Sequence, residues 1–262
     1  NRLLKDQVRD ASWYSALEIQ MADSGAEIER NREAVVARIN QAQADAITAF
    51  PLAELSIDPG DNPTDDLLSI MINTEVDGEP PLTTAELLPI IDQILLAGHE
   101  TTTNLIANAM MVLLNDPDLM RRLRDNPSDI PAMVEEALRW DPPIQCTFRR
   151  ATRDDTLEDT DVAEGDMVVP LWAGANWDPA VFADPERFDI DRSMAKPHMG
   201  FGFGPHFCAG AELARIETRI AFEALLDRLD QITLNEDESD LSHLPSFASH
   251  GYRRVSLNFV KR

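Results

Sequence analysis

The segment from Met199 to Arg215 constrains this chain more than any other, and it reads MGFGFGPHFCAGAELAR. Its glycines and proline exclude regular secondary structure as far as Pro205. From Ala209 onward, apolar residues recur at helical spacing. Those that we expect on one buried face are Leu213, Ile216, Ile220 and Leu225. Cys208 is therefore predicted to lie at a tight turn just before a helix.

Several roles are open to Cys208 at such a position. The free backbone N–H groups and the positive end of the helix dipole favour the ionised thiolate, which is the form that binds metal ions. Cysteine is more often a small buried apolar residue, and the local pattern alone leaves that interpretation open. A zinc site built on His206 and Cys208 is less favoured, because Cys146 has no partner at ligand spacing.

The same segment resembles the haem-binding signature of the cytochrome P-450 family, Phe-Gly-x-Gly-x-His-x-Cys-x-Gly before a helix. The matching residues are Phe201, Gly202, Gly204, His206, Cys208 and Gly210, followed by Leu213, Ala214 and Arg215. The resemblance implies haem b (iron protoporphyrin IX) as cofactor and Cys208 as its axial thiolate, a ligand that favours O–O cleavage. It also implies that His206 hydrogen-bonds a haem propionate. The residues expected to contact the cofactor are Ala97, Gly98, Arg149, Phe201, Gly202, His206, Cys208, Gly210 and Ala214.

A long helix is expected over residues 83–115. Thr83 or Thr84 can cap it, with Glu86 in its first turn. Apolar residues cover most of its faces, so we expect it to cross the middle of the molecule. Within it lies the run AGHETT, at residues 97–102.

This run resembles the oxygen-activation motif of the same family, Ala/Gly-Gly-x-Asp/Glu-Thr. The resemblance implies space for dioxygen at Ala97 and Gly98. It assigns catalytic roles to Thr101, which would hydrogen-bond the bound oxygen, and to Glu100, which would relay protons from solvent. The alternative from local chemistry is that Thr101 bonds back to the Ala97 carbonyl while Glu100 points to water or a basic partner.

Glu136 and Arg139 stand three residues apart on one helix face. As an exposed pair they would contribute only a few tenths of a kcal/mol. Their place between the other two motifs resembles the buried Glu-x-x-Arg pair of the family, which a later arginine joins. Both Arg187 and Arg192 fit that arginine, and the sequence does not choose between them.

A strand is expected from Ile144 to Arg150, after a proline turn. By resemblance, it passes the haem edge, where Arg149 would pair with a propionate. The residues expected to face substrate are Ile94, Ile144, Gln145, Cys146, Thr147, Phe247 and Ala248.

The predicted fold is mainly α with a small β portion, in the cytochrome P-450 architecture, as one domain over residues 1–262. Its parts are lid helices at 1–50, the oxygen-activation helix at 83–115, the Glu-x-x-Arg helix with strands and meander at 131–198, the cysteine loop and helix at 199–228, and C-terminal strands at 229–262. Family members are longer, so we expect roughly a third of a full chain, on the N-terminal side, to be absent from this sequence.

Charge and composition limit the partners. The net charge of −24 argues against nucleic acid and anionic membranes, and no run of about 18 apolar residues indicates a membrane span. Two cysteines without a framework suit a reducing compartment, so we expect a cytoplasmic protein.

The resemblance implies a haem-thiolate monooxygenase that hydroxylates or epoxidises a hydrophobic small molecule. Because the chain carries no flavin or nicotinamide motif, a ferredoxin and ferredoxin reductase are the expected electron donors. A peroxide-driven haem-thiolate enzyme and a non-catalytic haem-binding sensor are the alternatives. Glu100 and Thr101 favour an oxygenase over a sensor, since a sensor needs no proton relay.

Overall fold

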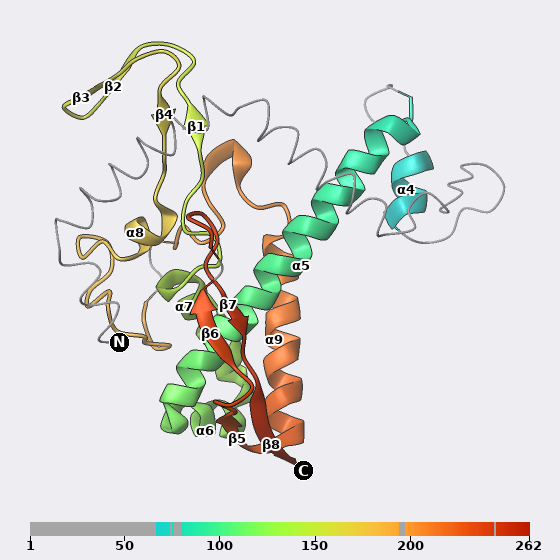
Figure 1. Cartoon of the computed structure of the whole chain (residues 1–262), viewed down its shortest axis with the longest axis vertical. Coiled ribbons are helices and arrows are strands. Elements are labelled where there is room, and N and C mark those ends of the chain that lie inside the picture. The colour runs from blue at the N-terminus through green and yellow to red at the C-terminus, as the bar shows by residue number, and fades with distance from the viewer. Residues whose placement is uncertain (1–66, 74, 76–79, 194–196, 244) are drawn as a thin grey trace. The chain divides into compact units, whose positions relative to one another are not determined.

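The computed structural model describes residues 67–73, 75, 80–193, 197–243 and 245–262 (Figure 1). The lid helices expected at 1–50 lie outside these ranges. The chain divides into two units, Asn1–Leu87 and Leu88–Arg262. The first contains helix α4 (Leu67–Asn73), and the second contains every element after the start of α5. The organisation as one domain over 1–262 stays a prediction.

Helices dominate the described residues. After α4 they are α5 (Thr84–Asn115), α6 (Pro117–Asp125), α7 (Ile130–Trp140), α8 (Trp172–Asn176) and α9 (Ala211–Arg228), with short 3-10 helices η2 (Pro127–Asp129) and η3 (Gly204–His206). Helix α5 begins where the capping pattern predicts. The Glu86 carboxylate accepts hydrogen bonds from the backbone N–H of Thr83 at 2.9 Å and from its hydroxyl at 2.7 Å, so Thr83 is the capping residue.

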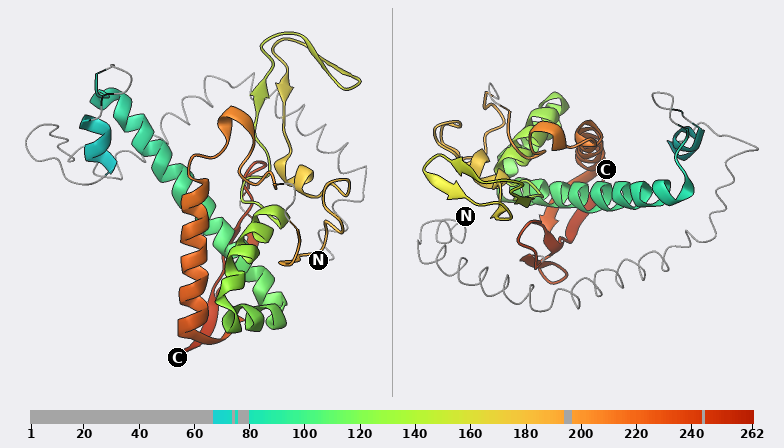
Figure 2. Two further views of the ribbon diagram at one scale, coloured as in Figure 1. Left: turned by 180° about the vertical axis from the view of Figure 1, so that it is seen from behind. Right: turned by 90° about the horizontal axis from the view of Figure 1, so that it is seen from above.

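The core of the second unit lies between the C-terminal half of α5 and helices α6, α7 and α9. Its largest contributors are Leu105, Met110 and Leu113 of α5, Leu123 of α6, Ile130, Met133, Val134 and Leu138 of α7, and Phe222 and Leu226 of α9. Each such side chain contributes about 1.5–3 kcal/mol through burial. Figures 1 and 2 show α9 beside α6 and crossing α5.

The face of α9 that packs differs from the predicted one. Leu213 is 58% exposed and Ile220 is 51% exposed, whereas Phe222 is fully buried. The buried residues of α9 are Ala211, Thr218, Phe222 and Leu226. Of the four residues predicted to be buried, only Leu225 packs against the core. The prediction was wrong because α9 carries apolar residues on two sides, and helical spacing shows which residues share a side but not which side meets α7.

The burial of side chains on helix α5 changes along its length. From Thr102 onward it contributes buried residues, but its side chains from Gln93 to Glu100 are exposed. Leu95 and Leu96 are among these exposed residues. The expected central position therefore holds for the C-terminal half of the helix only, as far as the described residues go. In the same residues, no helix combines the length and apolar character needed to cross a membrane.

The strands form two-stranded antiparallel sheets. They pair as β1 (Arg149–Arg150) with β4 (Met167–Val168), β2 (Asp155–Leu157) with β3 (Thr160–Val162), β5 (Leu229–Leu234) with β8 (Leu257–Lys261), and β6 (Asp240–His243) with β7 (Tyr252–Arg254). The molecule is thus mainly helical with small sheets, as predicted.

The strand expected over residues 144–150 is shorter than predicted. Only Arg149 and Arg150 form a ladder, while Ile144 bridges to Ser249 and Cys146 bridges to Leu171. Because neighbouring residues of this segment pair with two different parts of the chain, no continuous ladder forms. The pairing brings the segment against the turn that precedes β7.

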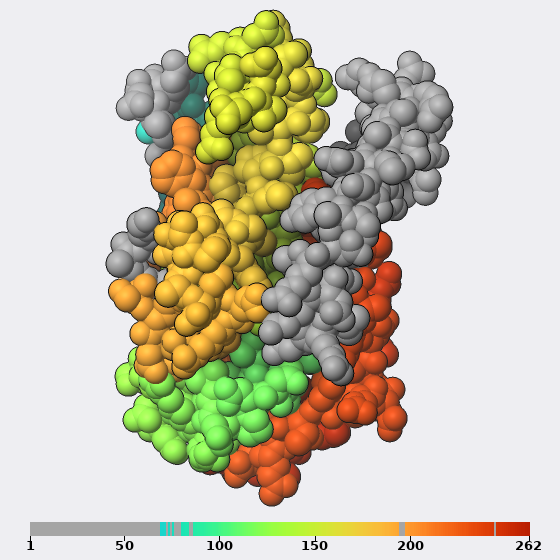
Figure 3. Space-filling view, turned by 90° about the vertical axis from the view of Figure 1, so that its left-hand side faces the viewer, coloured from blue at the N-terminus to red at the C-terminus, as the bar shows by residue number. Residues whose placement is uncertain are grey.

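The long irregular segment after α8 lies against the helical core. Figure 3 shows its yellow and orange residues directly above the green helices α6 and α7. Its carbonyl groups at Pro185 and Arg187 accept hydrogen bonds from Arg139 of α7, at 2.9 Å and 3.1 Å. This segment leads into the loop that carries Cys208.

Candidate active site

Cys208 lies in a loop two residues before the cap of α9. This loop contains the short 3-10 helix η3, so the expectation of no regular structure as far as Pro205 is wrong for Gly204 and Pro205. Gly202 and Gly204 have φ of 72° and 73°, in the left-handed region that glycine adopts without strain. The loop is closed by a hydrogen bond from the Cys208 N–H to the Phe201 carbonyl at 3.0 Å. Gly210 caps the helix, which begins at Ala211. Cys208 is a free, exposed thiol, as a ligand to a bound group must be.

The base of this loop is held by Glu135 of α7. One carboxylate oxygen accepts from Arg215 Nε at 2.6 Å, and the other accepts from His198 Nε2 at 3.1 Å. His198 Nδ1 accepts from the Gly200 N–H at 3.0 Å, so the ring proton is assigned to Nε2. The Arg215 guanidinium stacks over the Phe201 ring, with 4.7 Å from Cζ to the ring centroid.

These contacts shift the ionisation of the carboxylate and its partner. Burial raises the pKa of the Glu135 carboxyl, but the hydrogen bonds from His198 and Arg215, together with the charge of Arg215, outweigh burial and hold that pKa at about 2. The hydrogen bond with Glu135 raises the pKa of Arg215 above its ordinary value. Glu135 and His198 were not singled out from the sequence. Two sequence features could have indicated these residues: Glu135 is a second carboxylate next to Glu136, and His198 is a histidine just before the glycine-rich loop.

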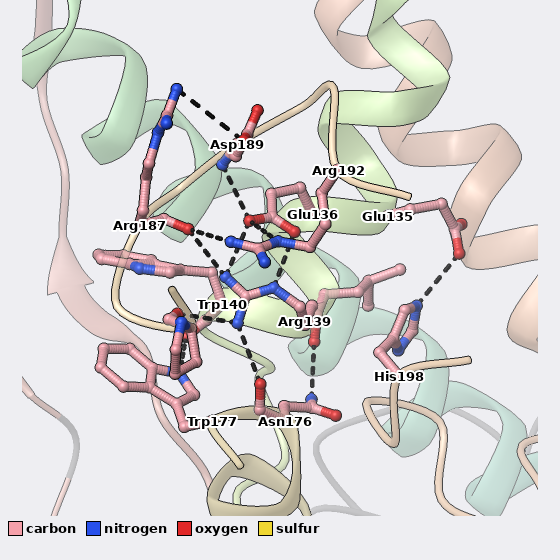
Figure 4. A network of polar contacts seen from close by, with 12 residues as sticks. Glu135, Glu136, Arg139, Trp140, Asn176, Trp177, Arg187, Asp189, Arg192 and His198 are labelled. Atoms are coloured by element: carbon pink, nitrogen blue, oxygen red, sulfur yellow. Dashed lines mark hydrogen bonds and ion pairs between the residues drawn. The ribbon is translucent and has the colours of Figure 1, made fainter. Parts of the chain in front are cut away.

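Glu136 and Arg139 form a buried pair at the centre of a polar network (Figure 4). Arg139 donates from Nε and Nη2 to the two Glu136 oxygens, both at 2.8 Å. Arg192 donates from Nε to Glu136 Oε1 at 3.2 Å, and its side chain is 8% exposed. The Arg187 side chain is 71% exposed and points to Asp189 at 3.9 Å. Arg192 is therefore the third side chain of the cluster, whereas Arg187 contributes its backbone carbonyl.

Asn176 connects this network to the cysteine loop. Its backbone carbonyl accepts from Arg139 Nη1 at 3.0 Å, and its side-chain oxygen accepts from the Met199 N–H at 2.6 Å. The side chain is fully buried at the end of α8. The network thus ties α7 to the residue where the glycine-rich segment begins. A lone asparagine before a tryptophan carried no signal of this role in the sequence.

The motif on α5 lies in the exposed half of the helix. Thr101 Oγ1 donates to the Ala97 carbonyl at 2.6 Å, which is the local alternative that the sequence left open. Glu100 Oε1 accepts a hydrogen bond from Ser249 Oγ at 3.1 Å, so its partner is a hydroxyl and not a base. A Cβ added at Gly98 would meet no atom within 4 Å. The small residues of the motif therefore border open space.

The expected substrate segments come together. The Gln145 N–H donates to the Ala248 carbonyl at 2.8 Å, and Ile144 bridges to Ser249. Cys146 is buried, with Sγ 3.8 Å from the Phe247 carbonyl, and burial raises the pKa of its thiol. Cys146 therefore presents no side-chain surface to a ligand, in contrast to the prediction. Its burial follows from the alternation of side chains along an extended segment.

The remaining predicted contact residues are exposed or partly buried. Ile94, Phe247, Arg149 and His206 are exposed, and Thr147 is partly buried, where its hydroxyl accepts from Trp172 Nε1 at 3.2 Å. Arg149 Nη1 donates to the Phe148 carbonyl at 2.9 Å. Ala214 lies in α9, where its carbonyl accepts from the Thr218 hydroxyl at 2.7 Å.

A groove of about 430 Å³ lies elsewhere, near the C-terminal end of α9. Leu123, Arg124, Ile130, Ile220 and Arg228 are among the residues that line it. It shares no residue with the predicted substrate contacts, so it gives no support to them.

The donor set fits a haem. The thiol of Cys208 is exposed, and a Cβ added at Gly204 would meet no atom within 4 Å, which leaves room for a flat ligand close to the backbone. Phe203 and Phe207 of the same loop are exposed apolar side chains that a porphyrin would cover. Exposed Arg149 and His206 are donors suited to propionate groups. The fold is mainly helical, and the loop before α9 presents a cysteine that can bind a metal ion as a thiolate.

Comparison with known proteins gives the family. A sequence profile named Cytochrome P450 matches residues 26–129 and 130–253. The chain therefore belongs to the cytochrome P450 family, and the recognition made from the sequence is confirmed.

Three relatives illustrate the likeness. Cytochrome P450 107B1 of Saccharopolyspora erythraea is 40% identical over 218 residues, which are 83% of this chain and 53% of that protein. The cytochrome P450 monooxygenase PikC of Streptomyces venezuelae is 40% identical over 196 residues, 74% of this chain and 47% of that protein. The crystal structure of CYP109E1 from Bacillus megaterium with testosterone has a TM-score of 0.73 at 34% identity, covering 91% of this chain and 64% of that one. The chain spans about half the length of the curated relatives that it matches.

Proposed function

We propose that this chain supplies the cysteine ligand and the proton-delivery helix of a haem-thiolate monooxygenase. The reaction is R–H + O2 + 2 electrons + 2 protons, giving R–OH + H2O, or the corresponding epoxidation of an alkene. The observation that carries the proposal is the exposed free thiol of Cys208 in a glycine loop before α9, in a member of the P450 family. The name of PikC, a monooxygenase, supports it.

The haem site would be held by three residues. Cys208 would provide the thiolate ligand, and Arg149 and His206 would each donate a hydrogen bond to a propionate. When bound, the haem supplies the binding and activation of dioxygen. The hydrogen bonds of Glu135 with His198 and Arg215 support the assignment of Cys208, because they fix both ends of the loop that presents its thiol.

Glu100 and Thr101 would move protons. The Thr101 hydroxyl donates its hydrogen bond to the Ala97 carbonyl, which leaves the oxygen lone pairs available to accept a hydrogen bond and so to orient a proton donor. Glu100 lies in the exposed half of α5, where its carboxylate can exchange protons with solvent. An acid beside an alcohol is a suitable pair for proton delivery.

The substrate would be a hydrophobic small molecule. The complex of CYP109E1 with testosterone supports this class, as do the exposed apolar side chains Ile94 and Phe247. The two electrons would come one at a time from a ferredoxin and its reductase.

The ligand assignment is tested by carbon monoxide difference spectra of the reduced, haem-loaded protein. We expect Cys208→Ser to lose the thiolate band and Cys146→Ser, the matched control, to keep it. Retention of the band in Cys208→Ser, with its loss in Cys146→Ser, would contradict the assignment.

The proton-delivery role is tested with Thr101→Ala and the matched control Thr103→Ala. Thr103, two residues further along and so about half a turn around the helix, makes the same kind of bond, from Oγ1 to the His99 carbonyl at 2.8 Å. In protein reduced by a ferredoxin and its reductase without added substrate, oxygen leaves as H2O2, which needs two protons, or as water, which needs four. We expect Thr101→Ala to raise the peroxide share and Thr103→Ala to leave it unchanged. Equal shares in the parent and Thr101→Ala would contradict the role, and with it the preference for an oxygenase over a sensor.

A further inference from the structure

Helix α5 carries a line of polar side chains below Glu100. Glu100, Asn104 and Asn108 are four residues apart, so they lie on one face of the helix. Asn104 and Asn108 are buried, while Glu100 stands at the exposed end. We call these three residues the polar stripe. Burial of an amide is costly unless its polar atoms are hydrogen-bonded, and Asn104 Nδ2 and Asn108 Oδ1 have no hydrogen-bond partner among the described residues.

Each member of the polar stripe meets one residue of the turn 249–251. Glu100 accepts from the Ser249 hydroxyl at 3.1 Å. Gly251 lies so close to Asn104 that a Cβ at this position would overlap its amide group. Asn108 Nδ2 lies 3.4 Å from the His250 carbonyl, to which it donates. The turn 249–251 therefore lies against the polar stripe, with one of its residues beside each member.

Other segments hold the same turn on its far side. The His250 N–H donates to the Pro143 carbonyl at 2.7 Å, and His250 Nδ1 lies 2.7 Å from Asp141 Oδ1. The Ser249 N–H donates to Ser246 Oγ at 3.0 Å, so the backbone of Ser249 is engaged and its hydroxyl is left for Glu100. The position of that hydroxyl is thus set by contacts that do not involve Glu100.

We propose that Ser249 is a positioning residue for Glu100. Its hydroxyl is held in place because the turn 249–251 packs against the buried part of the polar stripe, Asn104 and Asn108. The inference rests on the proposed role of Glu100 in proton delivery. An exposed glutamate has many rotamers, and a hydrogen bond to its ionised form is of the stronger kind. A fixed hydroxyl donor selects the Glu100 rotamers in which Oε1 faces the turn 249–251. Phe247 and Ala248, which are expected to face substrate, directly precede this turn. Ser249 would thereby link the substrate-facing turn to proton delivery on α5.

The test uses the haem-loaded protein with a ferredoxin and its reductase, without added substrate. The variants are Ser249→Ala, Ser249→Thr, Glu100→Ala and the double variant Ser249→Ala/Glu100→Ala. Ser242→Ala is the matched control, because Ser242 lies on β6 and its hydroxyl contacts Asp240. Two quantities are measured for each protein, namely the share of consumed oxygen released as H2O2 and the urea midpoint of unfolding.

We expect Ser249→Ala to raise the peroxide share toward that of Glu100→Ala, and Ser249→Thr to restore it because the hydroxyl is kept. The double variant should release no more peroxide than Glu100→Ala. Its urea midpoint should shift by less than the sum of the single shifts, since both single variants remove the same bond. Ser242→Ala should match the parent.

Two results would overturn the inference. One is a peroxide share in Ser249→Ala equal to the parent while Glu100→Ala raises it, which would leave the proton-delivery role of Glu100 standing. The other is full additivity of Ser249→Ala and Glu100→Ala in both measurements. A parental peroxide share in Glu100→Ala would instead remove the proton-delivery role itself, and the inference would fall with it.

Discussion

Glu136 has hydrogen-bond donors at both carboxylate oxygens. Arg139 reaches both oxygens, and Oε1 also accepts from Arg192 and from the Asp189 N–H at 2.9 Å. The side chains of Glu136 and Arg139 are fully buried. A buried carboxylate with all its donors is tolerated, but removal of one charged partner leaves charge uncompensated in a poorly solvated place.

The first prediction follows from the cost of leaving the buried Glu136 carboxylate without one of its charged partners. We expect Arg192→Ala to lower the free energy of unfolding by about 3 kcal/mol, because Glu136 loses a partner that water cannot replace. Arg187→Ala is the matched control and should change it by less than about 0.5 kcal/mol, since its exposed side chain is absent from the cluster and its carbonyl remains. Urea denaturation followed by circular dichroism measures both. The assignment of Arg192 is wrong if the two variants are destabilised equally.

A second prediction concerns pH and Glu135. Its pKa is about 2 in the folded chain, below the ordinary value of a glutamate. A lowered carboxyl pKa contributes stability that is present above the unfolded pKa of about 4.3 and is lost as pH falls toward the folded value. The difference in unfolding free energy between the parent and Glu135→Gln should therefore be constant near neutrality and shrink from about pH 4.5 downward.

Urea midpoints over this pH range test the Glu135 prediction. Glu217→Gln is a suitable control, because Glu217 is an exposed carboxylate of α9 without an ion pair among the described residues. A gap between the parent and Glu135→Gln that stays constant down to about pH 3 would contradict the role of the ion pair.

At the scale of the element, α9 has a packed side and an open side. Phe222 and Leu226 pack in the core with α6 and α7, while about half or more of Leu213 and Ile220 stays exposed and Ile216 is 37% exposed. The packed side sets the orientation of the helix. Because Cys208 lies just before the helix begins, that orientation also sets where the thiol is presented.

The third prediction tests this division of α9. Phe222→Ala should lower the free energy of unfolding by about 3–5 kcal/mol, through lost burial and the cavity left behind. Ile220→Ala should lower it by less than about 1 kcal/mol, because half of that side chain is already in water. Chemical denaturation of both variants provides the measurement. A larger loss in Ile220→Ala than in Phe222→Ala would reverse the assignment of the packed side.

At the scale of the whole molecule, acidic residues far outnumber basic ones. The chain carries a net charge of −24 and has an isoelectric point of about 4.4. Several of its ion pairs are exposed, such as that of Arg121 with Asp118, and such pairs contribute little. Self-repulsion therefore opposes the compact state at neutral pH.

The fourth prediction is that salt stabilises the folded chain. Raising sodium chloride from about 0.01 M to about 0.3 M shortens the screening length and should raise the urea midpoint at pH 7. The same increase should have a smaller effect near pH 5, closer to the isoelectric point, because less repulsion remains to be screened. A urea midpoint that falls with salt at pH 7 would mean that attractive ion pairs outweigh repulsion.

By itself, the sequence determined the features that depend on near neighbours. A cap at Thr83 or Thr84, the ends of the long helix and the pairing of Glu136 with Arg139 all follow from residues within a few positions of one another. Such contacts form wherever the local backbone has its preferred conformation, so spacing and residue type are enough to predict them. The matched signature around Cys208 was enough to recognise the family.

Only the tertiary structure decided which of several equivalent local choices is used. It selected Arg192 over Arg187, turned Phe222 rather than Ile220 of α9 inward, buried Cys146, and gave Glu100 a hydroxyl partner at Ser249. These outcomes depend on segments far apart in sequence, such as α5 and the turn before β7. Periodicity and motif spacing describe one segment at a time, whereas burial and partner choice are set by the free energy of packing segments together.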